Sequence, residues 1–123
     1  MRVSYIVSDE GRRGAEISAD GIGTIEVWKR KVTRSQAGAF DLRMKNITSQ
    51  ILKLSEKIWK TKKEDEAQRL TEEMFDLNTQ FIVDRLEGIT PAQIAELDVL
   101  DVGEISKVAN AVFEKDFAAK KNV

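Results

Sequence analysis

The side chains that most often carry out chemistry in proteins are scarce in this sequence. The chain has 123 residues, with no histidine and no cysteine. It therefore lacks the commonest general base, the commonest metal ligand and a thiolate nucleophile. Its carboxylates gather at 64–66, at 72–73 and at Asp98 and Asp101. Neighbouring helical residues point about 100° apart, so these groups do not converge as a hard cation requires. We expect no enzyme activity, no cofactor and no metal site.

Phosphate-binding loops and membrane spans are also missing from the sequence. No GxxxxGK[ST] motif is present, and this is the motif that cradles nucleotide phosphates. Gly21 and Gly23 lack a third glycine at the dinucleotide-binding spacing, and they read as a turn. No apolar run approaches the roughly 18 to 20 residues that cross a bilayer. These observations favour a protein that binds other macromolecules without inserting into a membrane.

The charges are divided unevenly along the chain. Residues 29–63 carry eleven basic and two acidic side chains, a net charge of +9, whereas residues 64–116 carry fourteen acidic and four basic ones, a net charge of -10. Such a division is typical of a basic surface for nucleic acid or of two segments that face each other. Ordinary solvated helix faces explain it equally well. Trp28 and Trp59 flank the basic stretch and could stack on bases, or they could be half-buried amphipathic residues.

The first thirty-two residues have the pattern of short strands. Within residues 3–7, a period of two places Val3, Tyr5 and Val7 on one face and Ile6 on the other, as in a strand. Asp20 and Gly21 separate two further such segments, and this dipeptide favours a tight hairpin turn. We expect a β-hairpin region over 1–32, with two or three strands. A sheet this small needs cover on its apolar face, which the helices downstream must provide.

A basic helix is expected over 33–60. Thr33 and Gln36 fit a capping box, in which each side chain satisfies a backbone amide at the helix start. The apolar residues behind it are spaced alternately by four and three, the period of a helix that packs in a bundle. They are Phe40, Met44, Ile47, Ile51, Leu54 and Ile58.

An acidic helix is expected over 65–87, after a turn within 59–66. The alternative to the turn is one long helix whose apolar face rotates there. Its main apolar stripe runs from Ala67 to Phe81, and Phe75, Ile82 and Leu86 lie on a second face. A helix that is apolar on two sides is normally buried between two partners. These are either the first helix and the C-terminal helices, or a second copy of the protein, and at least weak self-association through this helix is expected. Gly88 is read as the residue that ends the helix.

Two short helices complete the chain over 90–118. Thr90 and Gln93 form a second capping box with Pro91 at the first helical position, and Asp101 reads as the N-cap of the last helix. The expected fold is therefore α+β and mainly α. An N-terminal β-hairpin or small antiparallel sheet precedes a bundle of two long and two short helices, all in one domain over 1–123.

Two stretches of this sequence resemble the tail assembly chaperones of long-tailed bacteriophages. They are ADGIGTIEVWKRKVTRSQAGAFD and LEGITPAQIAELDVLDVGEISKVANAVFEKDF. The first is similar to the opening of that family, where an edge strand leads into a capped helix. The second is similar to its closing region of short helices punctuated by aspartates. The family has no catalytic or ligand signature to compare residue by residue, so the resemblance implies a role and no site.

The resemblance implies a non-enzymatic protein of the infected host cytoplasm that is absent from the mature virion. Such a protein binds the tape measure protein, keeps it soluble and helps to recruit tail tube subunits. A partner helix could lie in an apolar groove, although ordinary burial in the core is the alternative for the same side chains. The candidate contact residues are Trp59, Phe75, Ile82, Leu86, Phe113 and Phe117.

A second class of function stays open at this stage. A small nucleic-acid-binding regulator would use the basic segment 29–63, and its binding would weaken steeply with salt. The resemblance also predicts a longer, frameshifted form of the protein, because Lys120 and Lys121 before Asn122 can be encoded by a run of adenines.

Overall fold

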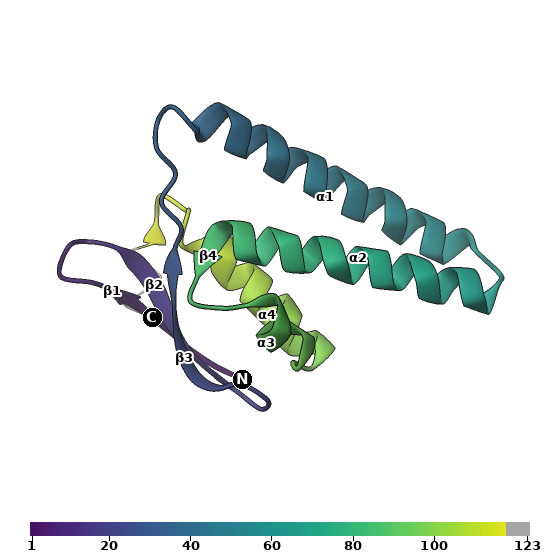
Figure 1. Cartoon of the computed structure of the whole chain (residues 1–123), viewed down its shortest axis with the longest axis horizontal. Helices are drawn as coiled ribbons and strands as arrows, with labels where there is room; N and C mark the ends of the chain where they lie inside the picture. The colour runs from purple at the N-terminus through teal and green to yellow at the C-terminus, as the bar shows by residue number, and fades with distance from the viewer. Residues whose placement is uncertain (118–123) are drawn as a thin grey trace. The chain divides into compact units, whose positions relative to one another are not determined.

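The computed structural model describes residues 1–117 and shows the α+β, mainly α fold that the sequence predicts (Figure 1). Lys120 to Asn122 and the last residue of the predicted helical region 90–118 lie outside the described residues. Three strands open the chain, and a short fourth strand follows the two long helices. The elements are β1 (Arg2–Val7), β2 (Arg13–Ala19), β3 (Gly23–Lys29), α1 (Ala37–Lys60), α2 (Glu64–Arg85), β4 (Leu86–Glu87), α3 (Pro91–Ala95) and α4 (Val99–Ala111).

The chain divides into two compact units, which we describe separately. The sheet unit comprises Met1–Arg30 and Ile82–Val123, and the hairpin unit comprises Lys31–Phe81. The sheet unit contains all four strands with α3 and α4, and the hairpin unit contains α1 and most of α2. The expectation of one domain over the whole chain stays a prediction.

The sheet is antiparallel, in the order β1-β2-β3-β4. The hairpin between β2 and β3 turns at the predicted Asp20-Gly21 dipeptide. Gly21 has a φ of 95° and Gly23 a φ of 68°, a backbone region that glycine enters without steric cost. The register pairs Ile17 with Ile25, so their apolar side chains share one face of the sheet.

The fourth strand was not predicted, and it corrects the end of the second long helix. We expected that helix to continue to 87 and stop at Gly88. It ends at Arg85, and the next two residues pair with β3, Leu86 with Lys29 and Glu87 with Trp28. A two-residue strand is too short to produce a period in the sequence. The strand can therefore be recognised only in the folded structure, where it pairs with β3.

The starts of the helices agree only in part with the predicted capping residues. The predicted box at α3 is confirmed, because Thr90 Oγ1 accepts from the Gln93 amide at 3.2 Å and Gln93 Oε1 accepts from the Thr90 amide at 2.9 Å. The prediction at α4 is wrong. This helix begins one turn earlier, with Asp98 as its N-cap, and Asp98 Oδ1 accepts from the Leu100 amide at 2.8 Å.

The predicted box at α1 is only half formed. Gln36 Oε1 accepts from the Thr33 amide at 3.2 Å, but Thr33 Oγ1 lies 3.1 Å from Ser35 Oγ instead of capping the helix. The residues from Thr33 to Gln36 form a separate turn, closed by the Gln36 amide on the Thr33 carbonyl at 3.0 Å. The helix therefore begins at Ala37, four residues later than expected.

The hairpin unit is built from α1 and α2 joined by residues 61–63 (Figure 1). The sequence allowed either a turn at 59–66 or one long helix whose apolar face rotates there, and the turn is confirmed. Basic residues occupy the last turn of α1 and acidic residues the first turn of α2, so both helix ends carry charges that their dipoles favour. The buried residues of the unit come from the two predicted stripes. They are Met44, Ile47, Leu54, Leu70 and Phe81.

Candidate partner-binding surface

The six predicted contact residues are divided between the surface and the core. Trp59 is 88% exposed, whereas Ile82 and Leu86 are completely buried. Phe75 and Phe113 are partly exposed. Phe117 was a candidate contact residue, with ordinary burial in the core as the alternative. It is buried, with its ring edge-on to Tyr5 at a centroid distance of 5.6 Å.

The burial of Ile82 and Leu86 changes the interpretation of the second helix. Its second apolar face was expected to pack either on the C-terminal helices of the same chain or on another copy. Both residues belong to the sheet unit, whose core also contains Ile17, Val27 and Ile105. Protein interiors leave few gaps larger than a water molecule. A partner therefore has no access to these two side chains in this structure.

Three large apolar side chains of α1 are exposed to solvent. Leu42 is 60%, Leu52 62% and Trp59 88% exposed. Leu52 and Trp59 lie seven residues apart, which is two helical turns, so they share one side of the helix. We call these three residues the α1 surface. Of these three residues, only Trp59 was a predicted contact residue. Leu42 and Leu52 fall outside the phase of the buried stripe, and this spacing is the signal in the sequence that indicates their exposure.

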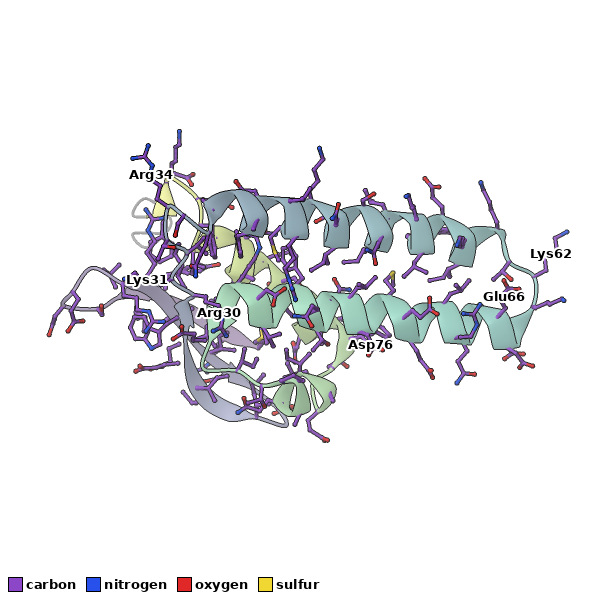
Figure 2. The ribbon with its side chains drawn as sticks, turned by 45° about the horizontal axis from the view of Figure 1, so that its top comes forward. Arg30, Lys31, Arg34, Lys62, Glu66 and Asp76 are labelled. Atoms are coloured by element: carbon purple, nitrogen blue, oxygen red, sulfur yellow. The ribbon has the colours of Figure 1, made fainter. Side chains whose placement is uncertain are left out.

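Lysines flank the α1 surface. Lys53, Lys57 and Lys60 are exposed on α1, and Lys53 and Lys60 repeat the seven-residue spacing of Leu52 and Trp59. Glu56 is the one acidic residue between 42 and 60. Figure 2 shows Lys62 in the loop at one end of the hairpin, where it continues the positive charge. The surface is therefore both apolar and basic.

A groove of about 420 Å³ lies between α1 and α2 within the hairpin unit. Its lining brings Lys53 and Lys57 of α1 together with Glu73 and Asp76 of α2. Figure 2 shows Asp76 on α2. The basic helix thus lies beside the acidic one, as the charge division suggested. Because these side chains are solvent-exposed, such pairs contribute only about 0 to 1 kcal/mol each.

The basic residues nearest the sheet pack against other residues of the sheet unit. Lys29 Nζ lies 4.4 Å from the centre of the Phe113 ring, and the Arg85 guanidinium lies 5.0 Å from it. Partial burial, followed by the charges of Arg13 and Arg12, lowers the pKa of Lys29 from its ordinary value. The basic segment 29–63 therefore begins with a lysine packed against an aromatic ring.

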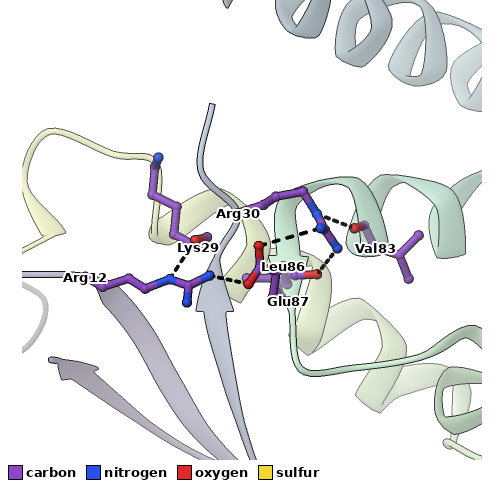
Figure 3. A network of polar contacts seen from close by, with 6 residues as sticks. All are labelled: Arg12, Lys29, Arg30, Val83, Leu86 and Glu87. Atoms are coloured by element: carbon purple, nitrogen blue, oxygen red, sulfur yellow. Dashed lines mark hydrogen bonds and ion pairs between the residues drawn. The ribbon is translucent and has the colours of Figure 1, made fainter. Parts of the chain in front are cut away.

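Arg30 belongs to a polar network that joins the end of β3 to the end of α2 (Figure 3). Its Nε donates to the Val83 carbonyl at 3.1 Å and its Nη2 to the Leu86 carbonyl at 3.3 Å. Arg12 contributes from the turn after β1, donating to the Lys29 carbonyl at 3.3 Å and to Glu87 at 2.5 Å. Val83 lies in the last turn of α2, where carbonyls have no intrahelical donor, so the network satisfies one carbonyl at the end of this helix.

The pKa of Glu87 provides a test of this network. The hydrogen bond from Arg12 lowers the pKa of the Glu87 carboxyl from its ordinary value, and the charge of Arg30 acts in the same direction. A carboxyl whose folded-state pKa is lowered stabilises the protein above its unfolded pKa, which is about 4.3 for glutamate. This stability is lost as the pH falls below that value through the lowered pKa.

We therefore expect Glu87→Gln to remove part of the acid dependence of unfolding. Between neutral pH and the lowered pKa, the free energy of unfolding should fall by up to about 1 kcal/mol more in the wild type than in the variant. The effect is this small because the pair is partly exposed. Urea unfolding at a series of pH values measures this difference, with the exposed Glu72→Gln as the control. Parallel pH profiles for wild type and Glu87→Gln would contradict the role of the network.

Comparison of the chain with protein-family models, with curated proteins and with solved structures finds no match. Within residues 1–117, no three His, Cys, Asp or Glu side chains gather as ligands of a metal ion would. No helix in this range combines the length and hydropathy of a membrane-crossing segment. The α1 surface is the feature of the hairpin unit on which we base a function.

Proposed function

We propose that this protein is a non-enzymatic tail assembly chaperone of a long-tailed bacteriophage. It binds the tape measure protein in the host cytoplasm, keeps that long helical chain soluble, helps to recruit tail tube subunits, and is absent from the mature virion. The resemblance of residues 19–41 and 86–117 to that family supports the role. The observation that carries the binding function is the exposure of Trp59, at 88%, on a basic helix.

Trp59 has the properties of an interface anchor. Tryptophan is among the residues that contribute most to protein interfaces, because its large ring loses much water-exposed area on binding. Leu52 extends the apolar area by two turns along α1, and lysines border it. An amphipathic helix with its own apolar stripe can lie along such a surface. Because the binding is helix to helix, the chemistry needs no cofactor.

Coexpression with the tape measure protein tests the proposal. The double variant Trp59→Ala, Leu52→Ala should lose most of its ability to keep that partner soluble. Truncating a tryptophan hot spot costs at least about 2 kcal/mol, which is roughly a thirtyfold loss of affinity. The measurement is the soluble fraction of the partner and its co-purification with the tagged chaperone.

Leu100→Ala is the matched control for this experiment. Leu100 is 80% exposed, but it lies in the sheet unit, so its truncation should not lower partner solubility. Equal soluble yields with the wild type and the double variant would contradict binding through α1. Retention of the free protein on heparin that falls steeply with salt would instead favour the nucleic-acid-binding alternative.

A further inference from the structure

The sheet has one face in the core of its unit and one face toward solvent. Side chains along a strand alternate between the two faces. Ala15, Ile17 and Val27 lie on the inner face and are completely buried. On the opposite face, the register places two rows of side chains next to each other across β1, β2 and β3. We call these two rows the outer face, with Ile6, Gly14 and Trp28 in one row and Ser4, Glu16 and Glu26 in the next.

Two carboxylates of the outer face lie directly opposite each other. Glu16 of β2 pairs with Glu26 of β3 in the register, and both side chains are exposed. Opposite side chains of an antiparallel pair are close neighbours, and like charges at such positions are destabilising. Neither side chain forms an ion pair or a hydrogen bond with another residue of 1–117. The sheet therefore contains a repulsive pair that a glutamine at either position would relieve.

An indole ring lies beside this pair of carboxylates. Trp28 follows Glu26 by two residues on β3 and is partly exposed. Its ring lies against the backbone of Gly14, because a Cβ at Gly14 would be only 2.5 Å from Cε3 of the ring. Gly14 and Glu16 are two residues apart on β2 and share the outer face. The ring and both carboxylates thus occupy adjoining positions, and Ile6 extends the apolar area onto β1.

The arginines near the outer face do not neutralise the two carboxylates. Arg12 and Arg30 both form ion pairs with Glu87, and their other hydrogen bonds go to backbone carbonyls. Arg2 lies one row beyond Glu16 on the sheet, where it is exposed and forms no ion pair with any residue of 1–117. The outer face is therefore suited to a cation from another molecule.

We propose that the outer face binds an arginine side chain in a basic segment of a second protein. The guanidinium donates hydrogen bonds to both Glu16 and Glu26, and its flat face covers the exposed part of Trp28. Arginine fits better than lysine, because its planar fork of donors matches carboxylates and stacks on aromatic rings. The bound charge also removes the repulsion between the two glutamates. A nucleic acid would instead bring phosphates against these carboxylates and be repelled.

This arginine site is separate from the proposed binding of a tape measure helix. The outer face belongs to the sheet unit, and the α1 surface belongs to the hairpin unit. The double variant Trp59→Ala, Leu52→Ala should therefore bind an arginine peptide as well as the wild type does. Failure of either proposal leaves the other standing, because the two are measured with different probes.

The fluorescence of Trp28 provides the measurement. The chain contains two tryptophans, so Trp59→Phe leaves Trp28 as the single reporter, and this variant is the reference protein. The probe is a blocked pentapeptide of glycine with two arginines, compared with the same peptide containing lysine or citrulline. Citrulline keeps the shape of arginine without its charge. The arginine peptide should change the emission saturably, the lysine peptide should bind at least about threefold more weakly, and the citrulline peptide should have no effect.

Two double variants of the reference protein test the role of the carboxylates. Glu16→Gln with Glu26→Gln should weaken binding of the arginine peptide at least about tenfold, because the charge-assisted hydrogen bonds are lost. The matched control is Glu72→Gln with Glu96→Gln, which removes the same charge from two other exposed positions. This control should bind within about twofold of the reference, since distant exposed charges are screened. Urea unfolding should show that the Glu16, Glu26 variant is more stable than the reference.

Four results would overturn the proposal. The first is no change in Trp28 emission with the arginine peptide. The second is equal binding of the arginine and lysine peptides, which would show a general attraction of cations. The third is equal weakening in both double variants, which would show an effect of net charge alone. The fourth is a Glu16, Glu26 variant less stable than the reference, which would contradict the repulsion between the two carboxylates.

Discussion

Replacing Leu54 with alanine is expected to lower the free energy of unfolding by about 2 to 4 kcal/mol. Leu54 is 9% exposed and is one of the three buried residues of α1. Removing three of its side-chain carbons loses their transfer free energy and leaves a cavity that neighbouring residues fill only in part. Urea unfolding followed by far-ultraviolet circular dichroism measures the change.

Leu52→Ala is the matched control, because it makes the same substitution two residues earlier in the same helix. Leu52 is 62% exposed, so its truncation should change the free energy of unfolding by less than about 0.5 kcal/mol. Both variants change helix propensity by the same amount, so the difference between their free energies of unfolding measures the effect of burial. A loss below 0.5 kcal/mol at Leu54 as well would mean that the stripe of α1 is not part of the core.

Gly88→Ala should destabilise the sheet unit by about 2 to 4 kcal/mol, from a strained backbone and from overpacking. Gly88 has a φ of 98°, a region that residues with a side chain rarely adopt. An alanine Cβ at this position would overlap the Glu26 carbonyl oxygen of β3. The backbone would have to shift where β4 pairs with β3, so the pairing of Glu87 with Trp28 should weaken. Chemical unfolding and amide exchange in β3 both report this effect.

Gly103→Ala makes the same substitution where neither cause applies. Gly103 lies within α4, and an added Cβ would meet no atom within 4 Å. Alanine is the better helix former by about 1 kcal/mol, so this variant should be slightly more stable than the wild type. A neutral result at Gly88 would show that the close approach to Glu26 is not required for the fold.

Strong periodicity predicted the elements of this fold well. The four-three spacing from Phe40 to Ile58 predicted α1, and Asp20-Gly21 predicted the turn between β2 and β3. These signals succeed because a helix or strand that buries one face must repeat apolar residues at its own period. The capping box at Thr90 succeeded for a similar reason, since both of its hydrogen bonds form within four residues.

Local sequence patterns gave wrong or incomplete predictions in two situations. In one, two residues were both suitable as the N-cap, and in the other, a strand paired with a segment distant in sequence. Asp98 and Asp101 both suit an N-cap, and the burial of Val102 and Ile105 placed the helix start at the earlier one. β4 has only two residues, and its pairing partner lies almost sixty residues earlier in the chain. No pattern within either segment indicates that pairing.

The sequence pattern also did not predict which apolar residues are buried and which are exposed. Ile82, Leu86 and Trp59 were equal candidates for partner contact in the sequence, yet two are completely buried and one is 88% exposed. Periodicity assigns a residue to a face of its own helix, but it does not say what covers that face. Packing within the sheet unit covers Ile82 and Leu86, and no described residue covers Trp59 to a similar extent.

The sequence by itself determined the kind and order of the longer elements, the turns between β2 and β3 and between α1 and α2, and the opposite charges of the two long helices. These properties depend on interactions between residues close along the chain, which spacing and residue type express directly. Only the tertiary structure decided that β4 joins the sheet, that Arg12 and Arg30 bind Glu87, and that Leu52, Trp59 and Leu100 stay exposed. Each of these depends on which distant segments meet, because burial is a property of the packed chain and not of any one segment.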